Sequence, residues 1–167
     1  FNEDSLWIET ILQYGGMSIY SSVDVIMEDG EAVCRTKYRA RSEEPGFFVV
    51  ALRPFNPEGV SFVHKLSCDN KKTRWIVNDR EHVLFDRPID RHAVSCYREG
   101  DVFKNLLSRE TRTSRKCDVG LISAAAMYKP PRGQEREITV RIPLANDPET
   151  PEVFPSADPQ PNWSSAL

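Results

Sequence analysis

The sequence lacks the features that mark membrane and nucleic-acid-binding proteins. No apolar run approaches the roughly 20 residues that a membrane-spanning helix requires. The formal net charge is only −3, and the 22 basic residues are scattered along the chain, so no basic patch is evident. We therefore expect neither a membrane nor a nucleic acid as a partner.

Motifs for metals, nucleotides and nucleophiles are also missing. The four cysteines form no C-x-x-C pair, and no two of the three histidines stand four residues apart. The sequence contains no G-x-G-x-x-G and no G-x-S-x-G. We therefore predict no metal site and no cofactor.

The isolated cysteines predict reduced thiols and hence a cytoplasmic location. Cys34, Cys68, Cys96 and Cys117 are widely spaced, which is typical of small buried hydrophobic residues in a reducing compartment, with two disulfide bridges as the alternative. No signal peptide is recognisable. The chain opens on Phe1 and closes on "NWSSAL", so we expect it to be a piece of a longer protein.

Short apolar runs with a period of two predict a mainly β protein. In "EAVCRTKYRAR" (31–41), uncharged residues alternate with arginines and a lysine, as a half-buried antiparallel strand requires. Asp29-Gly30, between two apolar segments, is a strong hairpin signal. We predict a two-layer antiparallel β-sandwich, supersandwich-like, over residues 1–145, with at most one or two short helices.

Other segments extend this prediction. "GFFVVAL" (46–52) is a continuous apolar run, which predicts a strand inside a sheet with both faces covered. "GDVFKNLLSRE" predicts a short helix with Asp101 as its N-cap. "SLWIETILQYGG" (5–16) fits a strand or a short helix, and we favour the strand. Further strands are predicted at 60–66, 74–77, 82–85, 93–98, 119–128 and 135–144.

Composition changes after residue 145. The stretch "ANDPETPEVFPSADPQPNW" holds five prolines among acidic and small residues and shows no periodicity. Such a segment stays extended and semi-rigid, so residues 146–167 are predicted to be a linker towards a C-terminal domain that this chain does not contain.

Several side chains leave a functional role open. Glu58, Glu99 and Asp101 could act as general acid and base, but each lies beside a glycine at a predicted turn, where capping or solvated carboxylates are common. Trp75, like Trp7 and Trp163, could stack on a sugar ring, although tryptophan is more often a core or interface residue.

Histidines and the basic strand face also have two interpretations each. His64 shares strand parity with Phe62 and Leu66, which favours a hydrogen-bonded core histidine over a functional one, while His82 and His92 are expected at the surface or in turns. The basic residues of 35–41 could bind an acidic partner, but we favour a solvated sheet face, on which long side chains lie over neighbouring apolar surface.

The segment "LRPFNPEGVSF" (52–62) interrupts an apolar region with an arginine and two prolines. Both prolines fix φ and remove hydrogen-bond donors, so the strand must end near Arg53 and the chain must turn before Gly59. Arg53 can then donate to loop acceptors, and Asn56 can close an Asx turn. We predict a structural corner, with Arg53, Asn56 and Glu58 as candidate interdomain or substrate-proximal residues.

Four segments, in order, resemble the N-terminal β-sandwich of bacterial proteins related to glycogen debranching enzyme. They are "VVALRPFNPEGVSFVHKL", "WIVND", "SCYREGDV" and "CDVGLISAAAMYKPPRGQEREITVRIPL", and the resemblance covers residues 20–145. In those amylo-α-1,6-glucosidase-like and glucoamylase-like hydrolases, the sandwich is non-catalytic and precedes an α/α barrel that holds the catalytic carboxylates.

The resemblance implies a structural and interdomain module of a glycogen- or starch-acting glycoside hydrolase. Its partner would be the protein's own C-terminal catalytic domain, and no catalytic residue would lie in this chain. The alternative is an autonomous carbohydrate-binding sandwich that holds α-glucan through exposed aromatic residues. A third interpretation makes the domain itself a hydrolase that uses Glu58, Glu99 or Asp101.

Overall fold

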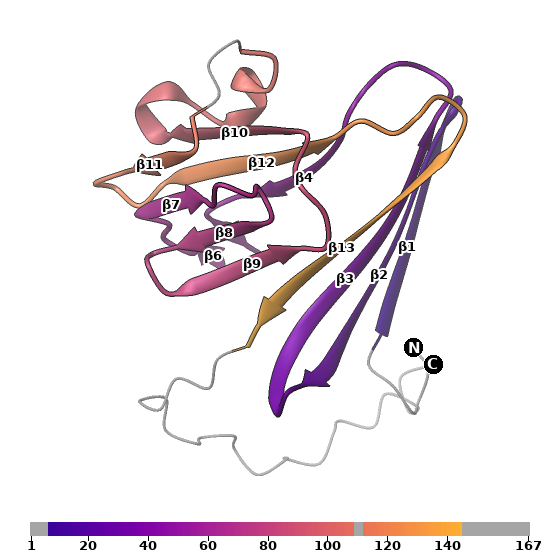
Figure 1. Ribbon diagram of the computed structural model, residues 1–167. Coiled ribbons are helices and arrows are strands. Elements are labelled where there is room, and N and C mark those ends of the chain that lie inside the picture. The colour runs from indigo at the N-terminus through magenta and orange to yellow at the C-terminus, as the bar shows by residue number, and fades with distance from the viewer. Residues whose placement is uncertain (1–6, 109–111, 145–167) are drawn as a thin grey trace, which may run out of the picture.

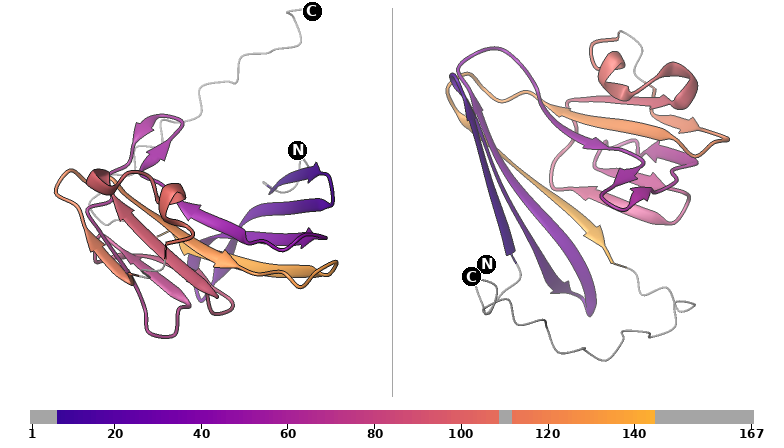
Figure 2. Two further views of the ribbon diagram at one scale, coloured as in Figure 1. Left: turned by 90° about the horizontal axis from the view of Figure 1, so that it is seen from above. Right: turned by 180° about the vertical axis from the view of Figure 1, so that it is seen from behind.

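Two antiparallel β layers form the protein, as predicted. The computed structural model describes residues 7–108 and 112–144. An eight-stranded sheet of order β1-β2-β3-β13-β9-β8-β7-β11 faces a three-stranded sheet of order β10-β12-β4, which we call the small sheet (Figure 1). A short β5–β6 hairpin projects from the side (Figure 2).

The strands of the eight-stranded sheet are β1 (Trp7–Tyr14), β2 (Met17–Glu28), β3 (Glu31–Ser42), β7 (Lys65–Cys68), β8 (Arg74–Val77), β9 (Glu81–Phe85), β11 (Ser114–Lys116) and β13 (Glu135–Pro143). The small sheet contains β4 (Phe48–Leu52), β10 (Arg91–Cys96) and β12 (Ile122–Tyr128), and the hairpin contains β5 (Phe55–Asn56) and β6 (Gly59–Val60). Two 3₁₀ turns, η1 (Tyr97–Glu99) and η2 (Val102–Asn105), follow β10.

The predicted hairpin at Asp29-Gly30 is confirmed. Strands β2 and β3 pair in register up to Glu28 opposite Glu31, and both turn residues have positive φ, 51° at Asp29 and 86° at Gly30. A two-residue turn of this kind matches the twist of the strands that it joins. The segment 5–16, for which a strand was favoured, contains β1.

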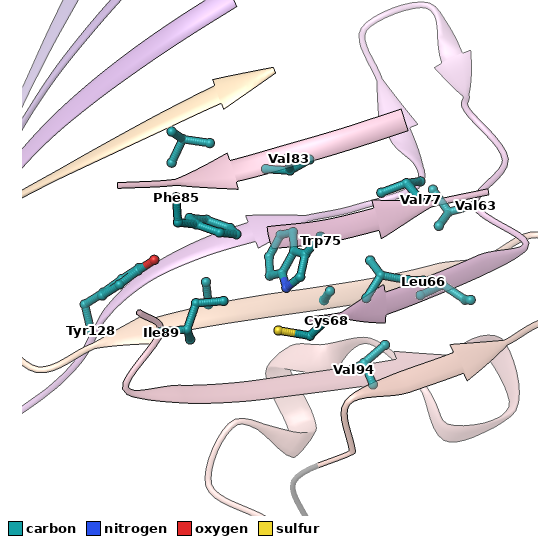
Figure 3. Close-up of a cluster of buried hydrophobic side chains, with 14 of the residues drawn as sticks. Val63, Leu66, Cys68, Trp75, Val77, Val83, Phe85, Ile89, Val94 and Tyr128 are labelled. Atoms are coloured by element: carbon teal, nitrogen blue, oxygen red, sulfur yellow. The ribbon is translucent and has the colours of Figure 1, made fainter. Parts of the chain in front are cut away.

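The core lies between the small sheet and the half of the large sheet that contains β7, β8, β9 and β13. Trp75 on β8 points into this space and meets the ring of Phe85 edge-on, with the centroids 4.9 Å apart (Figure 3). Tyr128 on β12 lies on the other side of Phe85, at 6.3 Å between centroids. All seven residues of β12 are buried. Ala124 and Ala126 face the main core, where their small side chains let the layers approach closely, and Ala125 packs behind the small sheet.

Beyond this core the large sheet continues without a second layer. Strands β1, β2, β3 and β13, which we call the arm, extend as a long blade past the small sheet (Figures 1 and 2). All eight residues of β1 are exposed. The two layers are therefore unequal, and the large sheet is only half covered by the residues that the structure describes.

Of two further expectations about individual elements, one is wrong and one is confirmed. The apolar segment 46–52 was expected inside a sheet, but β4 pairs only with β12 among the described strands and is an edge strand. Strand β4 is nevertheless apolar on both faces, because Phe48 packs on the main core while Val49 packs with Val102 and Leu106 behind the small sheet. The short helix expected after Asp101 is present as the 3₁₀ helix η2, and Asp101 caps it as predicted.

Other expectations concern bonds and termini. All four cysteines are free thiols, as expected. Within 7–108 and 112–144, no helix is long and apolar enough to cross a membrane. The predicted linker at 146–167, including Trp163, lies outside the described residues.

Candidate functional site

The segment 53–60 forms the corner that its prolines predict. Strand β4 ends at Leu52, and the chain then makes the small β5–β6 hairpin, in which Phe55 pairs with Val60. The Asn56 side-chain oxygen accepts a hydrogen bond from the backbone N–H of Glu58 at 3.0 Å, which is the predicted Asx turn. The two prolines and this turn together fix the backbone of the corner.

Arg53 ties the corner to the turn after β10. Its Nη2 donates to Oδ1 of Asp101 at 3.1 Å, and the two side chains are 51% and 36% exposed. The same carboxylate oxygen of Asp101 accepts the backbone N–H of Phe103 at 2.8 Å as the N-cap of η2. Of the three candidate interdomain residues, Arg53 and Asn56 are thus held in place, and Glu58 is exposed on the turn.

Apolar side chains project from this corner into solvent. Phe55, Val60 and Phe62 are 49% to 59% exposed. The Phe62 ring stacks on His64, with 5.9 Å between the centroids. Both rings pack against Gly120, where an added Cβ would lie 2.8 Å from each side chain and where φ is +69°. Glycine is therefore required at 120 by the backbone conformation and by this close approach.

The three candidate acids do not converge on a cleft. Glu99 accepts hydrogen bonds from Arg112, at 2.7 Å, and from Arg115, and its other oxygen accepts the backbone N–H of Cys96. Asp101 is paired with Arg53 and caps η2. Each carboxylate has a structural partner of its own, so the structure does not place Glu99 and Asp101 as a catalytic pair.

Trp75 is a core residue. It is 1% exposed and lies against Phe85 and His92 between the layers. A ring in this position cannot stack on a sugar, so of the two roles left open for Trp75 the core role is the observed one. Its Nε1 donor has no partner among the described residues.

Two of the three histidine predictions are wrong. His64, expected in the core, is exposed, because the chain leaves β6 at Val60 and enters β7 only at Lys65, so strand parity does not carry through. His92, expected at the surface, is 2% exposed, and its Nδ1 lies 2.8 Å from the carbonyl oxygen of Arg112. Burial lowers the pKa of His92, so the neutral ring donates to that carbonyl.

The basic face of β3 is solvated, as expected. Arg35 forms an ion pair with Asp24 on β2, and the Arg39 guanidinium lies 4.2 Å from the centroid of the Tyr20 ring. These contacts cross between neighbouring strands of the arm on the same face. The positive charges are thus used within the sheet.

Two hollows adjoin the 3₁₀ turns. One is an open apolar groove of about 710 Å³ behind the small sheet, lined by Phe47, Val49, Phe103, Leu107 and Met127 with two lysines at its rim. The other is a polar hollow of about 130 Å³ beside Glu99, smaller than the 300–1,000 Å³ of typical ligand sites. Neither places two free ionisable groups side by side, and no cluster of metal-ligating side chains occurs within the described residues.

Comparisons with known proteins give no assignment: no protein-family model, no curated protein and no solved structure matches the chain. The sequence prediction had missed the exposed apolar residues of the corner. The sequence does contain a pattern that predicts this exposure. In "FNPEGV" an Asx-type turn lies between two apolar residues, which predicts a two-strand hairpin too short to bury either apolar side chain.

Proposed function

We propose that this protein is a non-catalytic structural and interdomain module of a glycogen- or starch-acting glycoside hydrolase, and that the corner at 53–62 contacts the neighbouring catalytic domain. The observation that carries the proposal is the corner itself. Three exposed apolar side chains stand on a backbone fixed by two prolines, an Asx turn and an ion pair. A rigid apolar projection loses little entropy on docking, which favours a permanent contact.

The resemblance supports the choice of parent protein. Two of its segments, "RPFNPEG" and "EGDV", are far apart in sequence but are joined by the Arg53–Asp101 ion pair. The resemblance also puts the catalytic carboxylates outside this chain, in keeping with the structural partners of Glu99 and Asp101. Fold alone does not imply function, so the assignment to α-glucan hydrolysis depends on this resemblance.

Hydrogen exchange tests the docking role. A longer version of the protein, extended with its natural downstream sequence, is compared with the present chain. The amides of 53–62 are expected to exchange more slowly in the longer protein, while those of the Asp29-Gly30 turn serve as the control and keep their rate. Equal rates at the corner in the two proteins would contradict the docking role.

An activity assay tests the non-catalytic role. The present chain is expected to release no reducing sugar from maltooligosaccharides above the blank. Turnover that disappears in Glu99→Gln or Asp101→Asn would contradict the proposal and favour a hydrolytic domain. Calorimetric titration with maltoheptaose covers the carbohydrate-binding alternative: we expect no heat of binding, and saturable heat would favour that alternative.

A further inference from the structure

One face of the arm is built like the inside of a sandwich, but none of the described residues forms a layer over it. Direct partners across antiparallel strands point to the same side, so the register of β1, β2, β3 and β13 gives the composition of each face. On the side that continues the core, the large exposed apolar residues are Ile8, Leu12, Tyr14, Met17, Val25, Met27, Ile142 and Leu144. We call this side of the arm the apolar arm face.

The two faces of the arm differ sharply in charge. On β1 and β2 the apolar arm face carries no charged residue, since its other positions are Thr10, Ile19, Ser21 and Val23. The opposite face holds the ion pairs that join strands of the arm to one another, Arg35 with Asp24 and Arg141 with Glu28. Antiparallel sheets with one wet face show this alternation, so the apolar arm face has the composition of a buried surface.

The exposed area is too large for a free surface. The eight large residues of this face are 37% to 76% exposed. Together these fractions amount to on the order of 800 Å² of accessible surface, above the roughly 300–600 Å² of the largest patch on a typical monomer. This exposed area is about the same as the area that one partner buries in a standard protein–protein interface.

Two free strand edges border this face. Strand β1 ends the large sheet, and "WIETILQY" has neither proline nor lysine to discourage pairing with another strand. Strand β4 ends the small sheet at the point where cover of the arm stops. A hollow of about 110 Å³ between Met17 and Ile19 of the arm and Phe47 and Phe48 marks this boundary.

The missing layer has to be several strands wide. Covering β1 to β3 at the usual 4.8 Å strand spacing takes about three strands. The arm is itself a sheet of at least that width with an apolar face, so the arm of a second copy matches the surface to be covered.

We propose that a second copy of this chain covers the apolar arm face. The two arms stack face to face about a two-fold axis, and β1 of each copy runs beside β4 of the other. One symmetry operation then buries both apolar faces and both pairs of free edges. It also completes two layers of equal width, because the partner's arm lies in the plane of the small sheet, about 10 Å above the large one.

Leu12 and Ile11 provide a matched pair of test positions. They are neighbours on β1 with isomeric side chains and similar exposure, 60% and 66%, but Leu12 lies on the apolar arm face and Ile11 on the opposite face. Sedimentation equilibrium of the 167-residue chain should give twice 19.1 kDa. Leu12→Lys should weaken the dimer about a hundredfold or more, because it buries an unpaired charge, whereas Ile11→Lys should change the dissociation constant less than about threefold.

Hydrogen exchange of the same variants tests the edge pairing. Amides of β1 and β4 should be protected in the wild-type dimer and in Ile11→Lys, and should lose protection together in the Leu12→Lys monomer, whose near-ultraviolet circular dichroism should stay native. Each edge is tested separately by these amides. The outcome does not depend on the proposed function.

Four results would overturn the proposal. The first is a wild-type monomer at concentrations up to about 100 µM. The second is equal weakening by Leu12→Lys and Ile11→Lys. The third is open-ended association in place of a dimer, which indicates a head-to-tail contact. The fourth is dimerisation that appears only after truncation at Leu144, which would mean that the tail covers the face in the full chain.

Discussion

Replacing Trp75 by alanine is expected to destabilise the protein by about 3–5 kcal/mol. The indole is 1% exposed, so nearly the whole side chain is removed from water on folding. Burial of about 200–250 Å² at roughly 25 cal/mol per Å² contributes about 5–6 kcal/mol. Against this stands the Nε1 donor, which is buried without a partner among the described residues and costs about 1–3 kcal/mol.

The same reasoning makes a sharper prediction for Trp75→Phe. This change removes about 50 Å² of apolar area, worth roughly 1.3 kcal/mol, but it also removes the unpaired N–H. The two effects nearly cancel, so we expect a change in the free energy of unfolding within about 1 kcal/mol. Urea unfolding followed by far-ultraviolet circular dichroism measures both variants, with the slope m unchanged.

Trp7→Ala is the control, because Trp7 is 37% exposed on the edge strand β1, buries less area than Trp75 and is expected to cost less than Trp75→Ala. The reasoning is refuted if Trp75→Ala costs no more than Trp7→Ala. It is also refuted if Trp75→Phe is as damaging as Trp75→Ala, because the unpaired donor would then have no measurable cost.

Three further predictions concern single contacts. Burial lowers the pKa of His92, so the unfolded state takes up a proton first as pH falls through about 6.5, and the free energy of unfolding should decrease from pH 7 towards pH 5. His92→Asn keeps a hydrogen-bond donor and should flatten this pH dependence, as measured by urea titrations at each pH. The same pH dependence in wild type and His92→Asn would contradict the prediction. Tyr128→Phe should leave the stability of the protein unchanged or raise it by up to about 1 kcal/mol, because the Tyr128 hydroxyl is buried without a partner among the described residues. A loss of stability above about 1 kcal/mol in thermal melts would contradict this and indicate that the hydroxyl forms a hydrogen bond. A double-mutant cycle of Arg53→Ala and Asp101→Ala should give a coupling energy of about 0.2–1 kcal/mol, since both side chains are partly exposed. Asp101→Ala alone should cost about 1 kcal/mol more than Arg53→Ala alone, because it also removes the N-cap of η2. A coupling energy of zero would contradict a stabilising contact between the corner and η2.

Local signals were sufficient for the elements that depend on adjacent residues. The Asp29-Gly30 hairpin, the alternation of β3 and the cap at Asp101 involve contacts between positions close in sequence. Strand β8 was predicted with its observed bounds, and β13 to within one residue. The Asx turn at Asn56 follows from the same kind of short-range chemistry.

Errors arose where distant segments decide the outcome. His64 was assigned to the core by strand parity, yet a bridge between Val63 and Leu121 interrupts the strand. Gly120, far along the chain, makes room for the His64 ring at the surface. The burial of Trp75 likewise depends on the packing of two sheets.

The unequal size of the two layers was also beyond the sequence pattern. Period-two alternation shows that a strand has an apolar side, as it does for β3, but not whether another layer lies over that side. The arm is the result: its residues alternate correctly, while the second layer over them is missing from the described part of the chain. The apolar run of β4 was misassigned to a sheet interior for the same reason.

The complete burial of β12 limits which amino-acid substitutions the protein tolerates. This strand is flanked by β10 and β4 and is covered on both sides, with no exposed residue from Ile122 to Tyr128. Saturation mutagenesis should therefore find almost no tolerated replacement along β12, least of all at Ala124 and Ala126, where any larger group forces the layers apart. Within the described part of the chain, β12 should therefore be the strand least tolerant of substitution.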